Sequence, residues 1–184
     1  MTIRLTLLTP APGPGLRQAR IDADGPLDED GRRRARAAAE HLPPADHHLS
    51  APSRRCRETA EALGLNAATE AALHDVDLGS WHGRTLDELA VTDPDALAVW
   101  TTDPAAAPHG GESVLGLCRR IAGWLDQLPD STGRVLAVTD PSVARAAVLH
   151  ALTAPAHAFW RIDIPPLTCV QLTGRADRWN LRMR

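Results

Sequence analysis

Three charged side chains have the chemistry and the setting of a reaction centre. Asp140 follows an apolar run and precedes Pro141, so its carboxylate could cap a helix or act as a general acid or base. Asp75 lies in an irregular polar segment, where it could stabilise a loop or serve as a second catalytic carboxylate. Arg55 stands in the first turn of a predicted helix, against the helix dipole, and a bound anion or a carboxylate partner would explain it. We predict these three as the catalytic residues.

A second group of side chains could contact a ligand. The segment 101–111 contains two prolines and a Gly-Gly pair, which is typical of a mobile loop or lid. His109 and Glu112 beside that pair are therefore candidate ligand contacts, although exposed loop residues are more often passive. Trp81 is a candidate pocket wall, with His82 next to it.

Histidine and carboxylate side chains gather before residue 83, but their spacing matches no recognised metal motif. We therefore predict no metal site and no cofactor. The tryptophans are assigned to the core or to a pocket wall, because no basic groove accompanies them to suggest a nucleic-acid stacking platform. The residues considered as metal ligands are His74, Asp75, Asp77 and His82.

The composition limits the class of protein. With 184 residues, 43% of them apolar, the chain can bury one core, and we expect a single domain over residues 1–184. The net charge of -3 comes from interspersed charges, which argues against a nucleic-acid partner. The three cysteines are widely spaced, as for reduced thiols, and the apolar run near Met1 is too short for a membrane span. We expect a cytoplasmic protein that binds a small molecule, with a homodimer as a common outcome for such folds.

Strands and helices alternate along the chain. Residues 3–8 and 134–139 form apolar runs typical of buried strands, 47–50 is a short strand, and 168–172 with 178–183 alternate as a pair of strands. Between them the pattern predicts helices, several with clear capping residues. This order predicts an α/β fold, a three-layer αβα sandwich with a mostly parallel sheet. The predicted helices are 28–42, 51–63, 85–92, 93–100, 114–128 and 143–152.

The end of the first strand is unusual. Ligands of α/β proteins bind beyond the carboxyl ends of the strands, so a reactive side chain is expected after Leu8. Thr9, Pro10 and Ala11 follow instead. We interpret Thr9 and Pro10 as an uncharged wall that would suit a neutral ligand.

Five segments in order resemble the histidine phosphatase superfamily, the phosphoglycerate-mutase-like fold, over nearly the whole chain. No one of them is specific, but together they identify the fold. The segments are Pro26-Leu27 with Gly31, residues 50–60 (SAPSRRCRETA), residues 73–83 (LHDVDLGSWHG), residues 110–113 (GGES) and residues 138–143 (VTDPSV).

The resemblance implies a site that this chain fills only in part. In the family the first strand ends in Arg-His-Gly, whose histidine is phosphorylated, and a second histidine follows a later strand. Those positions correspond here to Thr9, Pro10 and Ala11 and to Asp140, while Arg55 and the acid Asp75 remain. Proline cannot form a phosphoenzyme, and a carboxylate at the second position repels phosphate.

From this resemblance we expect a repurposed fold that is not a phosphatase. The first hypothesis is cofactor-independent acid/base catalysis of an isomerisation, cyclisation, elimination or hydrolysis in secondary metabolism, with Asp140 and Asp75 as an acid/base pair. Arg55 would orient a carboxylate or hold developing negative charge. The alternative is a non-catalytic pseudoenzyme that binds a metabolite or a partner. Residual phosphatase activity is the third hypothesis.

Overall fold

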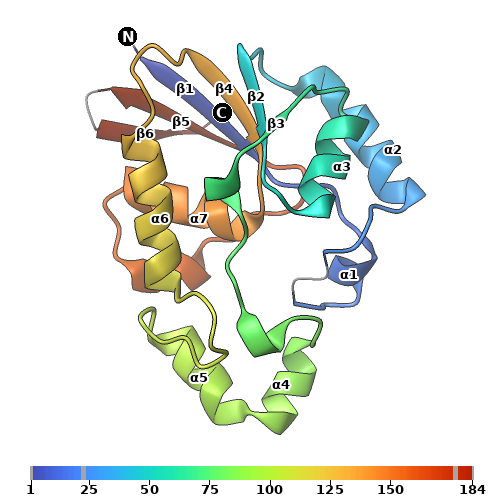
Figure 1. The fold of residues 1–184 in the computed structure, drawn as a ribbon, viewed down its shortest axis with the longest axis vertical. Helices are drawn as coiled ribbons and strands as arrows, with labels where there is room; N and C mark the ends of the chain where they lie inside the picture. The colour runs from blue at the N-terminus through green and yellow to red at the C-terminus, as the bar shows by residue number, and fades with distance from the viewer. Residues whose placement is uncertain (1, 22–23, 176–177, 184) are drawn as a thin grey trace.

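A six-stranded sheet in the order β3-β2-β4-β1-β5-β6 forms the centre of the computed structural model, which describes residues 2–21, 24–175 and 178–183 (Figure 1). Four strands run in parallel, and β5 and β6 run antiparallel to their neighbours. The strands are β1 (Ile3–Leu8), β2 (His47–Ser50), β3 (Ala68–Thr69), β4 (Arg134–Val138), β5 (Cys169–Arg175) and β6 (Arg178–Arg182).

Helices pack on both faces of this sheet. Figure 1 shows α2 and α3 together on one side and α6 and α7 on the other, while α4 and α5 project away from the sheet. The helices are α1 (Pro14–Arg17), α2 (Glu29–Ala38), α3 (Arg54–Ala62), α4 (Leu86–Thr92), α5 (Pro94–Thr102), α6 (Val114–Asp126) and α7 (Pro141–Ala151), with short 3-10 helices at Ala39–His41, Ala71–Leu73, Gly79–Trp81 and Ala156–Arg161.

The central strands are apolar because both of their faces are covered. In β1 the side chains of Leu5, Leu7 and Leu8 are at most 1% exposed, and in β4 the run 135–138 is fully buried. Two neighbouring parallel strands that are buried on both faces need such continuous apolar runs. The edge strand β6 instead alternates, with only Trp179 fully buried.

Local capping chemistry sets where the helices begin. Asp28 accepts a hydrogen bond from the Gly31 amide at the start of α2, and Thr85 and Glu88 form a reciprocal capping box at α4. These starts confirm the predictions from sequence. The predicted helix 28–42 is shorter as an α-helix, since it tightens into a 3-10 turn after Ala38.

The predicted α/β fold with a mostly parallel sheet is confirmed. Two short elements were not predicted, α1 and β3, since four and two residues are too few for a periodic pattern. No helix in the described ranges is long and apolar enough to cross a membrane. The single domain over 1–184 stays a prediction, and its terminal residues Met1 and Arg184 lie outside the described residues.

Candidate functional site

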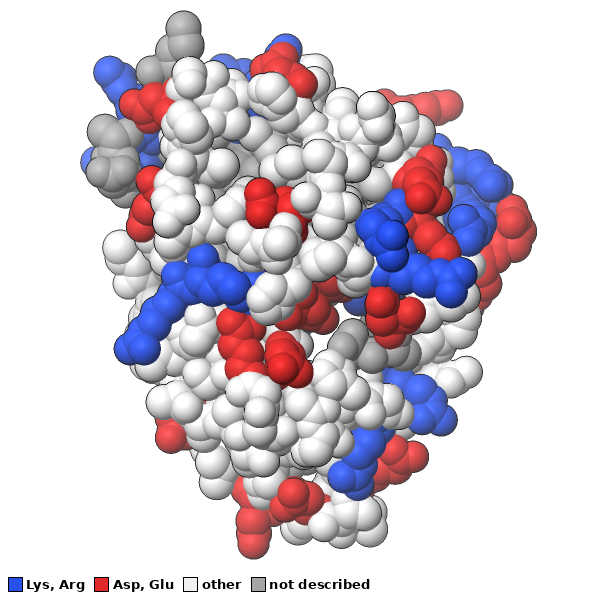
Figure 2. All heavy atoms as spheres, in the orientation of Figure 1, with Lys and Arg blue, Asp and Glu red and all other residues white. Residues whose placement is uncertain are grey.

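A hollow of about 140 Å³ lies at the edge of the sheet where β1, β2 and β4 end. Arginine and aspartate side chains dominate its wall, two of the first type and three of the second. Figure 2 shows acidic side chains gathered where the surface is hollowed, between the part that carries the sheet and the part that carries α4 and α5. The lining residues are Leu16, Arg20, Asp24, Ser53, Arg55, Asp75 and Asp140.

Asp140 is the most deeply placed charge of this hollow, with 1% of its surface exposed. It occupies the residue before α7, yet in the described part of the chain its side chain makes no capping hydrogen bond to that helix. Its Oδ1 accepts from Arg55 Nη2 at 2.6 Å, and its Oδ2 accepts from Ser53 Oγ at 3.2 Å. The carboxylate is therefore turned toward α3, and the capping interpretation does not describe this side chain.

Arg55 lies in the first turn of α3, where the helix dipole disfavours a positive charge. Its ion pair with Asp140 compensates that charge. Burial opposes its charge, but the Asp140 carboxylate outweighs that effect and raises the pKa of Arg55 above its ordinary value. Among the described residues, Asp140 is the only hydrogen-bond partner of the guanidinium. Its other N–H donors have no partner in the described ranges and can donate to a ligand in the hollow.

Cys56 also contacts this carboxylate, with its Sγ 3.4 Å from Asp140 Oδ2. Burial and the adjacent Asp140 charge raise the pKa of the Cys56 thiol well above its usual range. A thiol held in its protonated form is a poor nucleophile. Cys56 is therefore a donor to Asp140 and not a candidate for attack on a substrate.

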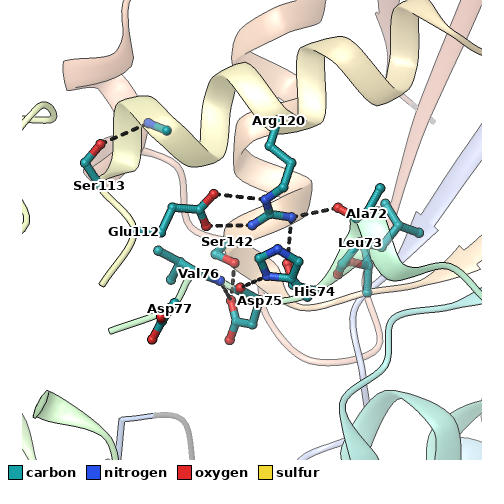
Figure 3. A network of polar contacts seen from close by, with 12 residues as sticks. Ala72, Leu73, His74, Asp75, Val76, Asp77, Glu112, Ser113, Arg120 and Ser142 are labelled. Carbon is teal, nitrogen blue, oxygen red and sulfur yellow. Dashed lines mark hydrogen bonds and ion pairs between the residues drawn. The ribbon is translucent and has the colours of Figure 1, made fainter. Parts of the chain in front are cut away.

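Asp75 reaches the same hollow from the loop after Leu73. Its Oδ1 accepts hydrogen bonds from the Val76 amide at 2.8 Å and from the Ser142 hydroxyl, which belongs to the first turn of α7 (Figure 3). The structure thus brings together the three predicted catalytic residues, Asp140, Asp75 and Arg55. Their catalytic roles stay predictions.

Glu112 does not line this hollow, because Arg120 of α6 holds it. The two guanidinium nitrogens Nε and Nη2 bind the Glu112 carboxylate at 2.9 and 2.6 Å, and Nη1 binds the carbonyls of Ala72 and His74 at 2.6 and 3.0 Å (Figure 3). Arg120 therefore connects the loop that carries Glu112 to the loop that carries Asp75. We did not predict this residue, since one arginine beside the apolar face of a helix carries no sequence signal.

Trp81 and His109 pack against each other inside the projecting part of the molecule. Their ring centroids are 5.1 Å apart, and Trp81 and His109 are each at most 3% exposed. The ring of Trp100 lies next to them, with its centroid 5.7 Å from that of Trp81. Burial lowers the pKa of His109, and its Nδ1 accepts from the Gly111 amide at 3.1 Å. The exposed His82 binds Asp77 at 2.9 Å and lines a neighbouring hollow that also contains Asp75.

Thr9 and Pro10 are buried and do not line the hollow. The Thr9 hydroxyl donates to the Pro165 carbonyl at 2.6 Å and accepts from the Thr168 amide at 2.9 Å, so backbone groups satisfy it. Thr9 thereby anchors the segment that leads into β5. Their proposed contact with a ligand stays a prediction.

Sequence reasoning missed Ser53, which binds Asp140, Ser142, which binds Asp75, and Arg20, which lines the hollow. Ser53 had a detectable signal, since it caps α3 as well as binding Asp140. Ser142 and Arg20 had none, because their roles depend on which loops meet in space. In the described ranges, no group of three or more histidine, cysteine, aspartate or glutamate residues could hold a metal ion.

Comparison with known proteins places this geometry in context. The sequence model of the histidine phosphatase superfamily (branch 1) matches residues 14–184. A glucosyl-3-phosphoglycerate phosphatase from Mycolicibacterium vanbaalenii is 37% identical over 109 residues, 56% of this chain and 48% of that protein. Its Mycobacterium tuberculosis counterpart is 32% identical over 148 residues, 74% of this chain and 66% of that protein. The chain thus matches between about half and two thirds of the length of these relatives.

Solved structures agree with these sequence matches. The mycobacterial glucosyl-3-phosphoglycerate phosphatase in complex with inorganic phosphate has a TM-score of 0.81 and 26% identity, over 98% of this chain and 95% of that one. A mycobacterial hydrolase has a TM-score of 0.85 and 27% identity, over 100% and 98%. These matches extend along the whole fold.

These relatives overturn the function expected from sequence. The expectation of a non-phosphatase acid/base enzyme, with a pseudoenzyme as the alternative, is contradicted because the curated relatives are named phosphatases and a solved neighbour holds inorganic phosphate. The assignment to secondary metabolism has no support from them. That expectation rested on Pro10 and Asp140 at the histidine positions, whereas the similarity to phosphatases extends over most of the chain. The family match itself covers 171 of the 184 residues, from 14 to 184, and the chain belongs to the histidine phosphatase superfamily.

Proposed function

We propose that this chain is a phosphatase that hydrolyses the phosphate monoester of a small organic molecule. The observation that carries the proposal is Arg55, which lies on the wall of a hollow at the carboxyl edge of the sheet and, within the described part of the chain, uses only Nη2 to bind Asp140. A guanidinium matches the oxygens of a phosphate group in geometry and charge. Arg20 on the same wall adds a second positive charge.

The chemistry must differ from that of a phosphohistidine enzyme if Pro10 and Asp140 occupy the histidine positions, as the resemblance implies. Water is then the nucleophile. Asp140 would accept its proton while the new P–O bond forms, and Asp75 would donate a proton to the alcohol oxygen as the old P–O bond breaks. The products are the free alcohol and inorganic phosphate.

Arg55 would keep its bond to Asp140 through this reaction. Only Nη2 is bound to the carboxylate, so the remaining donors can contact the phosphate oxygens and stabilise the charge that develops on them. Ser53 and Cys56 would hold the carboxylate in its orientation. Ser53 is the N-cap of α3 and Cys56 lies in its first turn, so the start of α3 orients the base and carries the anion-binding group.

The test is phosphate release from a panel of small phosphate monoesters, measured for the native chain and for Arg55→Gln. The variant removes the donors and should lower kcat/KM about 100-fold. Arg36→Gln, which removes an exposed arginine of α2, is the matched control and should leave the rate unchanged. Absence of phosphate release from the whole panel by the native protein would reject the proposal.

Acid-quench labelling separates the two chemical routes. A phosphohistidine enzyme accumulates an acid-labile phosphoprotein, whereas direct attack by water leaves none. A labelled protein would retain the phosphatase proposal and reject Asp140 as the base. The homodimer, the small-molecule partner and the cytoplasmic location stay predictions.

A further inference from the structure

A second hollow lies at the other end of β1, where the strand begins. It encloses about 120 Å³, and its wall contains three arginines, Arg4, Arg134 and Arg182. No carboxylate is present among the described residues that line it. In Figure 1 this end of the sheet is the one farthest from α4 and α5. It is therefore separate from the hollow that contains Arg55.

The strand register explains why the three arginines meet. Arg4 of β1 lies directly opposite Arg134 of β4 and opposite Thr173 of β5. Gln171 of β5 is opposite both Thr6 and Arg182. Paired residues of neighbouring strands point to the same face, so all of these side chains share one polar face of the sheet.

Two of these arginines have no ion-pair partner among the described residues. Arg134 binds Asp46 at 2.7 and 3.2 Å, and that contact occupies both carboxylate oxygens. Arg4 and Arg182 have no ion pair within the part of the chain that the structure describes. Like charges directly opposite each other on adjacent strands are destabilising. Asp46 compensates Arg134, so the positive charge that an added anion would compensate is mainly that of Arg4 and Arg182.

We propose that this hollow binds one phosphate group, either free inorganic phosphate or the phosphate of a small metabolite. Its volume corresponds to about four water molecules, which is enough for one tetrahedral oxyanion and little more. Arginine donors would bind the oxygens in pairs, and the neutral side chains of Gln171 and Thr173 supply further donors. The proposal does not depend on the phosphatase activity proposed above.

Backbone and side-chain NMR during a titration with inorganic phosphate tests the site in the full chain. Amide and guanidinium signals of residues 4–6, 134–135, 171–173 and 182 should shift together, apart from signals of the Arg55 hollow. Arg4→Gln should weaken binding at this site about tenfold and leave the Arg55 signals as they were. The control Arg36→Gln should change neither set.

Thermal unfolding provides a second measurement, in which Arg4→Gln should change Tm in opposite directions without and with phosphate. Without added anion, Arg4→Gln should raise Tm slightly, because it removes the repulsion with Arg134. With phosphate present, the native protein should be the more stable of the two, since ligand binding stabilises the folded state.

A titration with glycerol phosphate distinguishes free phosphate from the phosphate of a metabolite, because tighter binding than for inorganic phosphate assigns the site to a metabolite. Phosphate shifts confined to the Arg55 hollow would overturn the proposal.

Discussion

The two hollows at opposite ends of β1 use arginine in opposite ways. In the hollow of the candidate active site, two arginines face three aspartates, and Arg55 is paired with the buried Asp140. In the hollow at the start of β1, three arginines line a wall without a carboxylate in the described residues. The first hollow is acidic, whereas all charged side chains that line the second are arginines, one of which is paired with Asp46 beside the hollow.

This difference in charge separates a hollow suited to anion binding from one suited to proton transfer. A hollow whose charged side chains are all arginines can hold an anion, but it has no group that takes up or delivers a proton. The carboxylates of the acidic hollow weaken its attraction for phosphate, but they are groups that suit general acid/base catalysis. The proposed turnover therefore belongs to the Asp140 end, and the proposed anion binding without turnover belongs to the Arg4 end.

Asp140→Asn should make the acidic hollow resemble the positive one, and its effect is the largest that we expect. Removing the base should lower turnover about 1,000-fold. Loss of the negative charge should tighten the binding of inorganic phosphate about tenfold. Steady-state kinetics and a phosphate titration of the same preparation measure both changes.

The folded state should survive that substitution. Arg55 loses its ion-pair partner, but its side chain is 20% exposed and can recruit water, so we expect about 2 kcal/mol less free energy of unfolding. Asp95→Asn, an exposed acid at the start of α5, is the matched control. Weaker phosphate binding by Asp140→Asn would contradict the contrast between the hollows.

Arg120→Gln should disturb one hollow and spare the other. The substitution leaves the Glu112 carboxylate and two carbonyls without their donor, at a cost of about 3 kcal/mol in unfolding free energy. For a chain of this size, Tm should fall by about 6 to 12 °C. Because the loop that carries Asp75 also loosens, kcat should fall several-fold, while phosphate binding at Arg4 stays the same. A change at both hollows would show that they are coupled.

The sequence predicted most of the fold because its local signals agree. Apolar runs marked β1 and β4, and Asp28, Ser53 and Thr85 begin helices where their capping chemistry indicates. The predicted helix 114–128 corresponds to α6 (Val114–Asp126), whose Leu117 and Ile121 are buried. Elements shorter than one period, such as β3, left no pattern.

The site was harder to predict because its contacts join distant loops. The bond between Ser53 and Asp140 spans 87 residues, and the contacts of Arg120 with Ala72 and His74 span 48 and 46. Nothing in the local sequence shows that Glu112 turns to Arg120 and away from a ligand. The hollow that contains Arg4 was missed for the same reason, since the register of β1, β4, β5 and β6 brings its arginines together.

Asp46→Asn should give the smallest effect, and it changes the hollow that contains Arg4 and Arg134. Hydrogen bonds and the charge of Arg134 lower the pKa of Asp46 from 3.8 to about 2. A carboxylate with a lowered pKa in the folded state stabilises the protein above its unfolded pKa, and this contribution is lost as the pH falls from about 4 toward 2. The native chain should therefore lose stability in that range more steeply than Asp46→Asn, in acid unfolding followed by circular dichroism.

Because the Asp46→Asn variant frees Arg134, phosphate should also bind to this hollow about twofold to threefold more tightly at neutral pH. Unchanged binding would mean that Arg134 does not take part in the positive hollow.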